Sequence, residues 1–523
     1  MYPVSNEYKD ATYAPIRTMK GRVTFDISDV TAAGDVNNIA TSQEFILSNK
    51  QQLINKNREQ TYNLATWEPN RFKLDGSFTF PDDTIENNKE MGYVSNVLCG
   101  ADGVFDPYQT ISFTFNEPHS SMGLTITFDA RNNEYASDFT VTAYDANNDV
   151  IDTVEVVGNT EVQAVPIGQL YQYKKIEIVI KKWCKPYRRA RVVEVDFGVV
   201  RVYSDNSLIK MNLIEEMDIM TSTLPSPEFK FTVDNANREF NILNPQGFYK
   251  YLQQRQQVIP EIGVVIEGAT EFVKLGEYLL WEWISDEGSM TATFTARTVL
   301  DLMSSFEYEN LAPKTNYSLY DMAEEIFTLC GIENYEIDTE LQSIKTLGLV
   351  KKTNCKNILQ MISIAGMCNV WVTRSNVIML KQSHTSIDDP VDRIDSDNMY
   401  KEPQIELDKV VRAVEVTYYT DLDTRQAVII DTDIEKGDVL KLENNTTINT
   451  EEHAENVANW ILSQKTYRAK YSANWRGNPA NELNDIITVE DGYGQNKNAI
   501  VTKNELTYQG YLTAKTEARG GTS

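Results

Sequence analysis

Alternation of apolar and polar residues is the dominant pattern in the chain, and it predicts β-strands. Between residues 67 and 203 the alternating runs are short, turn residues separate them, and no helical stretch intervenes. These runs are residues 110–115, 124–128, 139–144, 150–157, 175–180 and 192–197. Because successive side chains of a strand point to opposite faces of its sheet, each run indicates a strand with one buried face. We therefore predict a β-sandwich or jelly roll for residues 67–203.

A second group of alternating runs begins after residue 206. It comprises residues 229–233, 258–266, 274–284 and 290–296, together with one short helical candidate at residues 247–253. Long strands with a single short helix predict a small barrel. An alternating run at residues 20–27 has no partner close by in the sequence, which indicates that residues 67–203 are inserted into this barrel. We therefore assign residues 1–66 and 204–300 to one discontinuous domain.

Helical periodicity becomes clear in the middle of the chain. Ser318 is a typical N-cap with an acidic residue three positions later, and Gly331 is a typical stop signal. The apolar residues between them that share one helical face are Leu319, Met322, Ala323, Ile326 and Phe327. A second amphipathic helix is predicted for residues 355–368, and two strands follow at residues 369–380. These elements predict a small α+β domain over residues 301–400.

Strand patterns return over residues 401–523, where one helix is predicted at residues 451–465. The texture of this region is similar to that of residues 207–300, which favours a second, duplicated barrel. The predicted fold class is therefore mainly β with an α+β part.

The charge balance limits the classes of function. Lys and Arg total 49 against 76 Asp and Glu, which gives a net charge of −27 over 523 residues. A surface that grips duplex DNA needs clustered cations, so this balance argues against such a surface. The five cysteines are never in CxxC spacing, as expected for reduced thiols made in a cytoplasm. No apolar run of about 18 residues occurs, so no membrane-spanning segment is predicted, and the N-terminus lacks the pattern of a signal peptide.

Two short constellations are candidates for chemistry, and a plain turn is the favoured interpretation of each. His119 precedes Ser120 in a loop, but a nucleophilic serine needs a base held by a third group. Residues 145–149 offer oxygen ligands for calcium, but the bidentate Glu of an EF-hand loop is absent. Phosphate-loop, nucleophile-elbow, zinc-protease and dinucleotide-binding motifs are absent as well. We therefore predict no catalytic residues, no metal ligands, no cofactor and no enzymatic activity.

One cationic segment stands out from the acidic background, at residues 181–191. Its basic and aromatic side chains are Lys181, Lys182, Trp183, Arg188, Arg189 and Arg191. We predict that they contact a second subunit or another protein partner. A solvated loop, and stacking of the segment against a base or a sugar, remain alternatives.

The C-terminal region carries the most specific pattern. Its motif consists of Trp475, Arg476, Gly477, Asn478 and Pro479, and it leads through residues 482–491 into a returning run at residues 500–510. This pattern resembles the end of the hub domain in tail proteins of phages and phage-tail-like particles that infect Gram-positive bacteria. In that family the motif belongs to a second tube-like barrel. We interpret it as a corner of the backbone rather than a contact surface, because Gly and Pro beside a strand usually mark backbone geometry.

Other segments agree with this resemblance. They are residues 1–27, residues 229–249, the predicted helix pair at 318–330 and 355–368, and residues 67–203, which resemble an inserted galactose-binding-like sandwich. The resemblance implies two tail-tube-like β-barrels (residues 1–66 with 204–300, and residues 401–523), a small α+β hub domain (residues 301–400) and an inserted β-sandwich (residues 67–203).

The resemblance implies a structural role as the hub of a tail tip or baseplate. Three copies would form a homotrimer whose barrels make a pseudo-sixfold ring between the tail tube and a spike or tip protein. Its expected partners are also the distal tail or baseplate proteins and the tape-measure protein. DNA would pass through the ring without being bound, because acidic side chains lining a lumen repel it. The particle would assemble in the host cytoplasm, and the protein would lie in the virion at the tail tip.

Two other functions remain open. In the first, a carbohydrate-binding adhesin, residues 67–203 bind cell-wall sugars through a stacked aromatic pair or a calcium site. In the second, a wall hydrolase, activity depends on two carboxylates or on His119. The chain ends at Ser523, two residues after Gly521, so we expect no separate wall-cutting domain.

Overall fold

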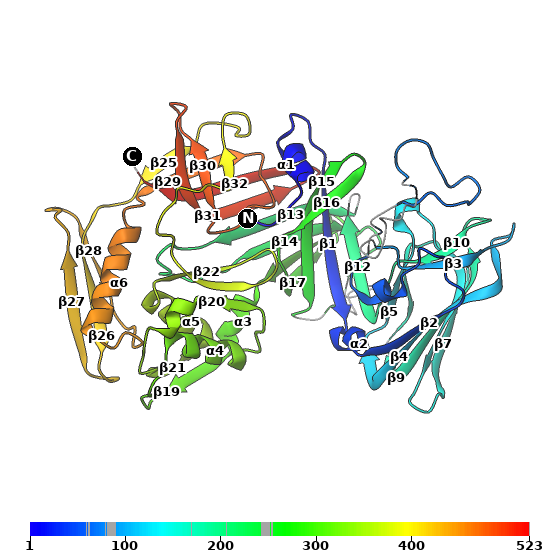
Figure 1. Cartoon of the computed structure of the whole chain (residues 1–523), viewed down its shortest axis with the longest axis horizontal. Helices are drawn as coiled ribbons and strands as arrows, with labels where there is room; N and C mark the ends of the chain where they lie inside the picture. The colour runs from blue at the N-terminus through cyan, green and yellow to red at the C-terminus, as the bar shows by residue number, and fades with distance from the viewer. Residues whose placement is uncertain are drawn as a thin grey trace. The chain divides into compact units, whose positions relative to one another are not determined.

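A computed structural model describes residues 1–58, 60, 63–78, 80, 90–168, 170–204, 207–241, 252 and 255–521. It divides into two compact units: unit 1 consists of residues 1–24 and 202–523, and unit 2 of residues 25–201. Strands dominate both units (Figure 1), which confirms the mainly β fold class. Residues 25–66 lie in unit 2, whereas the sequence pattern places them in the first barrel. The reason is that β2 (Val36–Thr41) pairs with a strand of unit 2, and alternation does not reveal a strand's partner.

Unit 2 is built from antiparallel sheets. The larger sheet has the order β2, β4 (Val104–Ser121), β9 (Leu170–Trp183), β6 (Ala136–Tyr144) and β7 (Val150–Val156). A smaller sheet has the order β11 (Glu194–Asp196), β5 (Leu124–Thr127) and β8 (Gln163–Ile167), and β3 (Tyr93–Leu98) pairs with β10 (Arg189–Val192). The helical segments are α2 (Val30–Gly34), η1 (Lys50–Ile54) and η2 (Ala130–Asn132).

One hydrophobic core fills unit 2. It combines buried side chains of the larger sheet, such as Phe113 and Ile178, with buried side chains of the smaller sheet, such as Ile126 and Val195. The two sheets thus bury their inner faces together, which is the packing that a sandwich requires. The likeness of this unit to galactose-binding domains stays a prediction.

Unit 1 contains one continuous sheet that the structure describes with 14 strands. Its order is β12 (Gly198–Ser204), β1 (Met19–Ser28), β15 (Gln257–Ile266), β17 (Tyr278–Asp286), β18 (Thr291–Arg297), β14 (Glu228–Asp234), β13 (Leu208–Glu216), β31 (Asn496–Tyr508), β32 (Leu512–Gly520), β29 (Ala469–Trp475) and β25 (Gln404–Leu407). Three further strands flank this path: β16 (Ala269–Lys274) pairs with β15, β30 (Ile486–Glu490) pairs with β31, and β24 (Asp392–Ile394) pairs with β30. The helix α1 (Asn6–Tyr13) precedes β1.

The strands predicted for two separate barrels therefore belong to one sheet. The connection is β13, which pairs with β14 on one side and with β31 on the other. Within this sheet, we call the strands numbered up to β18 the first half. We call its strands numbered from β24 upward the second half. A sequence pattern predicts each strand separately, whereas the pairing of strands almost 300 residues apart depends on tertiary packing.

The helical part of unit 1 follows the first half in the chain. Its elements are α3 (Val299–Leu302), η4 (Met303–Ser305), β19 (Glu307–Asn310), α4 (Leu319–Leu329), β20 (Tyr335–Ile337), η5 (Thr339–Gln342), β21 (Val350–Asn354), α5 (Cys355–Ala365), β22 (Cys368–Val372) and β23 (Ile378–Gln382). Helix α4 is confirmed in detail, because Ser318 and Asp321 form a capping box and all five predicted apolar side chains are buried. Gly331 follows the helix with a φ of +66°, as a C-terminal stop requires.

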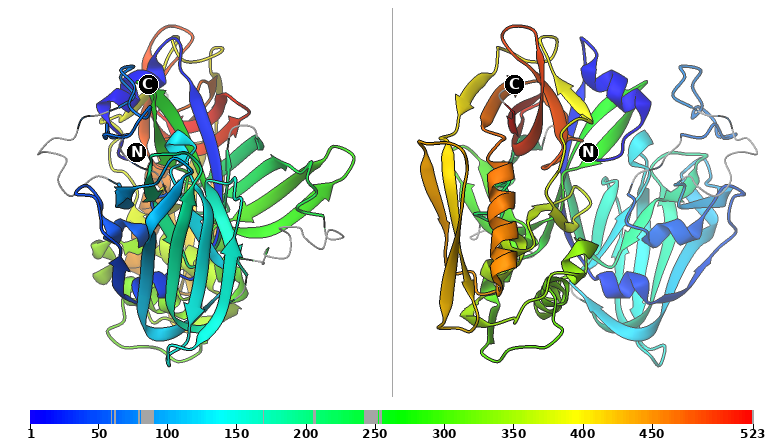
Figure 2. Two further views of the ribbon diagram at one scale, coloured as in Figure 1. Left: turned by 90° about the vertical axis from the view of Figure 1, so that its right-hand side faces the viewer. Right: turned by 60° about the vertical axis from the view of Figure 1, so that its left-hand side comes forward.

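The core around these helices extends past the predicted boundary at residue 400. It includes Val414 and Val416 of β26 (Val411–Tyr419) and Val457 and Ile461 of α6 (Glu451–Gln464). Figure 2 (right) shows α6, in orange, lying along the sheet that β26 forms with β27 (Arg425–Asp431) and β28 (Asp438–Leu442). Elements of residues 411–464 therefore pack with the helical part, whereas the sequence pattern assigns them to the second barrel.

No helix among the described residues is long and apolar enough to cross a membrane. The helical candidate at residues 247–253 lies outside the described residues, apart from Leu252.

Candidate functional site

The motif at residues 475–479 forms a corner where β29 ends. Trp475 is buried, and its Nε1 donates a hydrogen bond to Thr516 Oγ1 at 2.9 Å. Gly477 has a φ of +79°, and a Cβ at this position would lie 2.8 Å from the Cβ of Ala514 on β32. Glycine meets both requirements, because it adopts a left-handed backbone without strain and has no Cβ to collide.

The N-terminal segment of unit 1 is bonded to this corner. Arg17 donates to the carbonyl of Gly477 at 2.8 Å and to the carbonyl of Arg476. Arg476 donates in turn to the carbonyl of Ala14 at 2.7 Å. Burial, followed by the charge of Arg476, lowers the pKa of Arg17 to about 10, so its guanidinium is still charged at neutral pH. Segments about 460 residues apart in the sequence thus meet at the motif.

Asn478 extends the same corner to the start of β24. Its Nδ2 donates to Asp392 Oδ2 at 3.0 Å, and the hydroxyl of Tyr13 donates to the same carboxylate at 2.5 and 2.6 Å. Burial, and then the negative charge of Asp392, raises the pKa of Tyr13, so the hydroxyl remains a donor. The polar side chain of Asn478 is therefore used inside the molecule.

A buried arginine, Arg374, connects the helical part to the corner. It lies in the turn between β22 and β23 and is 1% exposed. Its guanidinium donates to Glu215 Oε1 at 2.6 Å, to the carbonyl of Asn481 at 2.9 Å and to the carbonyl of Pro479 at 3.2 Å. Burial lowers the pKa of Arg374, but the carboxylate of Glu215 outweighs this effect and the net shift is upward. Nothing in the sequence singles out Arg374, because a charged residue between Thr373 and Ser375 is typical of an exposed turn.

A polar face runs across seven neighbouring strands of the continuous sheet, from β18 through β14, β13, β31, β32 and β29 to β25. Side chains directly opposite one another in a ladder lie on the same side of the sheet. One row across the strands is Thr295, Lys230, Asn212, Thr507 and Thr513. The next row is Arg297, Glu228, Ile214, Glu505, Lys515 and Asn474. The polar face therefore crosses the junction between the two halves without interruption.

The opposite side of these strands is largely buried, except on the edge strand β25, where Ile405 and Leu407 are 48% and 62% exposed. It contains Phe229 and Phe231 of β14, Leu213 of β13 and Leu506 of β31, all of which are almost inaccessible to solvent. The alternation that predicts these strands thus separates an apolar inner side from the polar face.

Charges on the polar face are close to balanced. Its basic side chains are Lys210, Lys230, Arg297, Lys470, Lys503, Lys515 and Arg519, and its acidic side chains are Glu216, Glu228, Asp234, Glu406, Glu505 and Glu517. Lys503 pairs with Glu216 at 2.9 Å, and Lys470 pairs with Glu517 at 3.0 Å. Each sign is therefore partly neutralised by a neighbouring strand, in contrast to the large acidic excess of the whole chain.

The cationic segment of unit 2 is largely internal. Trp183, Arg188 and Arg191 are 1%, 6% and 2% exposed, so their side chains are used within the chain, and their contact with a partner stays a prediction. Arg188 Nε donates to Glu134 Oε1 at 3.0 Å, and Arg191 Nη1 donates to Glu68 Oε1 at 2.9 Å. The acidic partners come from distant parts of the same chain, which a local run of basic residues does not reveal.

A third arginine, Arg71, completes this buried network through pairs with Asp129 at 2.9 Å and Glu134 at 3.3 Å. Burial opposes ionisation of Glu68, but the hydrogen bond and charge of Arg191 outweigh it and lower the pKa of Glu68 to about 2. Both signs of charge are therefore present in the buried network at neutral pH.

The three other residues of the segment, Lys181, Lys182 and Arg189, are partly exposed. Lys181 pairs with Glu155 at 2.6 Å, and Arg189 Nη1 donates to the carbonyl of Ser95 at 2.9 Å. A contact of these three residues with a partner stays a prediction.

His119 has no serine at its ring. Its Nε2 lies 2.9 Å from Asp35 Oδ2 and its Nδ1 lies 3.6 Å from Asp29 Oδ2, while Ser120 Oγ accepts from the backbone N–H of Gln172 at 3.0 Å. The backbone N–H of Glu117 and the ring of His119 lower the pKa of Asp35 to about 2. The imidazole therefore lies between two carboxylates and is not arranged to activate Ser120.

The loop at residues 145–149 closes on itself. Asp145 Oδ1 accepts from the backbone N–H groups of Asn147 at 2.8 Å and Asp149 at 2.9 Å, and Asn148 has a φ of +68°. This is the geometry of an Asx-type hairpin turn. Among the described residues, no group of three or more His, Cys, Asp or Glu side chains is placed to hold a metal ion.

Comparisons with known proteins give matches among solved structures. No protein-family model matches the sequence, and no curated protein matches it. The 43 kDa tail protein of prophage MuSo2 from Shewanella oneidensis is 12% identical with a TM-score of 0.40, over 61% of this chain and 95% of that one. A tail protein from Neisseria meningitidis MC58 is 10% identical with a TM-score of 0.41, over 61% and 93%. Prophage tail protein gp18 from Listeria monocytogenes EGD-e is 9% identical with a TM-score of 0.39, over 62% and 92%.

These structural neighbours are tail proteins. The family suggested by the motif at residues 475–479 is a family of tail proteins as well. The motif itself serves the internal corner described above, whereas the polar face is a solvent-accessible surface of the second half.

Proposed function

We propose that this protein is a structural hub of the tail tip or baseplate of a phage or a phage-tail-like particle. In this proposal the polar face lines part of a central passage, and three copies form a ring between the tail tube and a spike or tip protein. Distal tail or baseplate proteins and the tape-measure protein are its other partners. The location is the virion, after assembly in the host cytoplasm.

The observation that carries this proposal is the pairing of β13 with β31. It joins two strand-rich halves side by side, so that each chain supplies two neighbouring segments of one sheet with a common polar face. Three copies would supply six such segments, as the resemblance of the sequence to tail hub proteins implies. A six-segment ring of this kind matches the symmetry of a hexameric tube.

The charges of the polar face suit the passage of DNA. Binding of DNA depends on clustered cations that release counterions from the phosphates. Here basic side chains alternate with acidic ones across the ladder, as in the pair Lys503 and Glu216. The expected acidic lining is therefore replaced by a mixed one, and we still expect DNA to pass without being held.

The first test is the mass of the purified chain in solution by light scattering at several concentrations. We expect three times 59.5 kDa, alone or after addition of the tail-tube protein, and a threefold ring in electron micrographs. A monomer under both conditions would contradict the proposal.

The second test replaces acidic side chains of the polar face by basic ones. We expect the triple variant Glu216→Lys, Glu505→Lys, Glu517→Lys to retain duplex DNA in a gel-shift assay at about 0.1 M salt, whereas the wild type does not. The matched control is Glu333→Lys, Glu340→Lys, Glu435→Lys, which makes the same charge change at exposed positions away from the face. Equal retention by both variants would show that net charge alone matters and would remove the role of the face.

A second candidate function is carbohydrate binding by unit 2. Trp67 is 98% exposed, and an exposed indole offers a flat apolar surface for a sugar ring. This candidate predicts that a glycan array retains the full chain and that Trp67→Ala abolishes retention, whereas Tyr493→Ala, with a side chain 92% exposed in unit 1, does not.

A further inference from the structure

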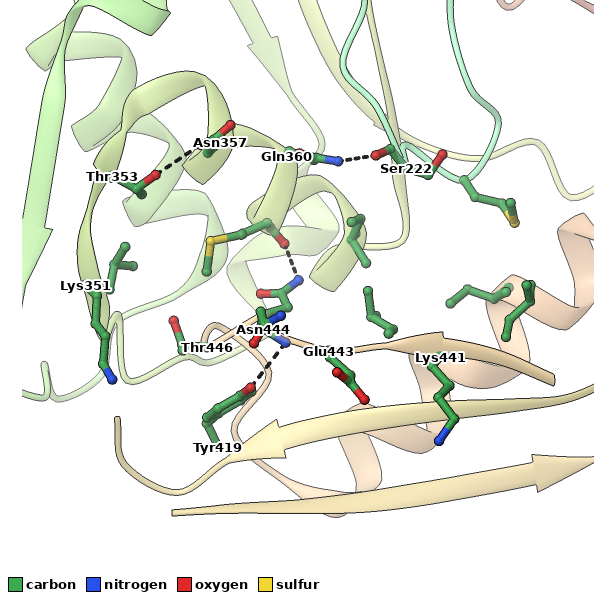
Figure 3. A pocket seen from close by; sticks show the side chains of 18 of the residues that line it. Ser222, Lys351, Thr353, Asn357, Gln360, Tyr419, Lys441, Glu443, Asn444 and Thr446 are labelled. Carbon is green, nitrogen blue, oxygen red and sulfur yellow. Dashed lines mark hydrogen bonds between the residues drawn. The ribbon is translucent and has the colours of Figure 1, made fainter. Parts of the chain in front are cut away.

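We propose that a groove in the helical part of unit 1 binds an extended segment of another protein in which apolar and acidic side chains alternate. The groove is a cavity of about 660 Å³ between β21, α5, β26 and β28 (Figure 3). The proposal rests on the proposed function only in expecting this partner to be another tail component. The chemistry of the groove is independent of that expectation.

The floor of the groove is apolar. It is lined by Met361 and Ile364 of α5, Val414 of β26 and Ile461 of α6. Val414 is fully buried, and Ile364 and Ile461 belong to the same core. Because these three side chains are at most 9% exposed, little of the floor is in contact with water. The side of an extended segment that packs against it must be apolar, since a polar group there would lose its hydrogen bonds to water without gaining a partner.

The loop at residues 443–446 closes one end of the groove. Asn445 Nδ2 donates to the carbonyl of Met361 at 2.9 Å, and Thr446 Oγ1 donates to the carbonyl of Leu349. The backbone N–H of Asn444 donates to the hydroxyl of Tyr419 at 3.1 Å, as Figure 3 shows. These bonds hold the loop to α5, to the start of β21 and to β26, so the groove is preformed.

Two strand edges border the groove. Residues 350–353 of β21 and 440–442 of β28 line it without a gap, so backbone as well as side chains faces the cavity. Both strands are outermost in their sheets: β21 pairs with β19, and β28 pairs with β26. A strand with one free edge is the usual template for an added strand.

The pairing pattern shows which amides are already bonded. The backbone N–H of Asp438 donates to the carbonyl of Val410 at 2.9 Å, and the N–H of Cys355 donates to the carbonyl of Phe306 at 2.8 Å, so these two amides are already used. Both pairings contain a register shift, opposite the start of β28 and within β21. We expect an extended segment in the groove to bond to amides of the outer edges of these two strands.

The charge of the groove selects an acidic partner. Its charged lining residues are Lys351, Lys352, Lys441 and Glu443, an excess of cations in a chain whose net charge is −27. Figure 3 shows Lys351 and Lys441 on different elements around the cavity. Each of the three lysines already pairs with a carboxylate of the chain: Lys351 with Asp423, Lys352 with Glu307 and Lys441 with Glu415, and the lysine side chains are 66%, 62% and 58% exposed. Exposed pairs contribute little to stability, so carboxylates of a partner can replace them.

The test uses the full chain and a fluorescent peptide of alternating Val and Glu. We expect saturable binding by fluorescence anisotropy that weakens as salt is raised. We also expect slower hydrogen exchange at residues 350–353 and 438–442 in the presence of the peptide. Absence of binding, or protection elsewhere in the chain only, would overturn the proposal.

Variants and altered peptides sharpen the test. The double variant Lys351→Glu, Lys441→Glu is expected to weaken binding roughly tenfold or more. The matched control Lys345→Glu, Lys401→Glu, at exposed positions outside the groove, is expected to bind like the wild type. Equal weakening by both pairs of substitutions would overturn the role of the groove lysines. The same peptide with a methyl group on every second amide cannot complete a strand ladder, and its binding with unchanged affinity would point to an apolar ligand site instead.

A second copy of this chain is the other occupant that the test distinguishes. If light scattering showed self-association that Lys351→Glu, Lys441→Glu abolishes, the groove would be an interface between copies and the proposed partner would be wrong. A chain that stays monomeric both alone and with the tail-tube protein, and that binds the peptide, would contradict the proposed hub and support the groove.

Discussion

Basic residues of unit 2 and of the polar face in unit 1 both pair with carboxylates. They differ in their exposure to solvent. In unit 2, Arg191 has a side chain that is 3% exposed, and its partner Glu68 is inaccessible to solvent. On the polar face, Lys503 has a side chain that is 24% exposed, and its partner Glu216 is 64% exposed. Both pairs join a cation to a carboxylate, but water can replace the partner only on the face.

Clustering of charged residues along the sequence therefore does not predict which of them are exposed and available to a partner. The densest basic run of the chain, at residues 181–191, contributes to an internal network. The basic residues of the polar face are scattered over residues 210–519 and gather only because their strands are neighbours. The energetic consequences also differ, since an uncompensated charge is costly when buried and is hydrated at the surface.

The largest effect is expected from Arg374→Ala, which tests whether burial has the same consequence in unit 1. It leaves Glu215 buried without its cation and removes the bonds to the carbonyls of Pro479 and Asn481. We expect the free energy of unfolding of unit 1 to fall by about 3–5 kcal/mol in urea titrations. The matched control is Arg393→Ala, whose side chain is 66% exposed and pairs with Asp395. If both variants lost the same free energy of unfolding, burial would not be the cause of the loss.

A slightly smaller effect is expected from Arg191→Ala in unit 2. Glu68 loses its closest cation, but Arg71 remains near it at 3.8 Å. We expect a loss of about 3 kcal/mol, visible in calorimetry and as faster hydrogen exchange within residues 25–201. Lys181→Ala, from the partly exposed part of the same segment, is the control and should change stability by less than about 1 kcal/mol. A stable Arg191→Ala would show that the network is dispensable.

The third prediction concerns Glu194, a buried carboxyl group of unit 2 whose Oε2 has no hydrogen-bond partner within the described part of the chain. Burial, and then the charge of Asp196, raises its pKa from 4.5 to about 9. The folded state therefore holds a proton that the unfolded state releases, so the free energy of unfolding falls as pH rises from about 4.5 to about 9.

The measurement compares Glu194→Gln with the wild type in urea titrations across this pH range. Because the variant lacks the titrating group, its advantage in stability should grow with pH, by at most about 1.4 kcal/mol per pH unit. Glu155→Gln, at a side chain that is 61% exposed in the same unit, is the control and should show no such trend. Parallel pH profiles of wild type and Glu194→Gln would contradict the raised pKa.

The smallest effect is expected from Lys503→Ala on the polar face. Its pair with Glu216 is partly exposed, so we expect a loss of at most about 1 kcal/mol in the free energy of unfolding. A double-mutant cycle with Glu216→Ala isolates the interaction. A coupling energy as large as that of the buried pairs would remove the distinction between the two regions.

Local features of the fold are predictable from the sequence. Helix α4 is the best example, because its cap at Ser318, its apolar face and its stop at Gly331 all act within one or two turns. The strands β4, β5, β6, β7 and β9 of unit 2 are predicted for the same reason, as are α6 and the turn at residues 145–149, whereas β2, β3 and β8 are not. The glycine in the motif at residues 475–479 also has a local cause, because the backbone at Gly477 is left-handed.

Features that depend on distant partners are not predictable in this way. Trp183 follows the partly exposed Lys182, and Arg191 is two residues from the partly exposed Arg189, yet both are buried because Glu134 and Glu68 approach from other elements. Residues 411–442 read as strands of a second barrel and pack instead with α6 on the helical core. Arg374 carries no sequence signal at all, because its importance comes from the groups that surround it.

The local elements of this protein and their caps can be predicted from its sequence. The same holds for the alternation that separates a buried from a polar side of each strand. The amino-acid composition likewise argues against a DNA-gripping surface. Three features become visible only in the folded chain. The two predicted barrels share one sheet through β13 and β31, some basic residues are buried, and a groove lies between two strand edges. The physical reason is range: capping and alternation act between residues a few positions apart, whereas strand pairing and buried ion pairs are selected by packing between segments that can be hundreds of residues apart.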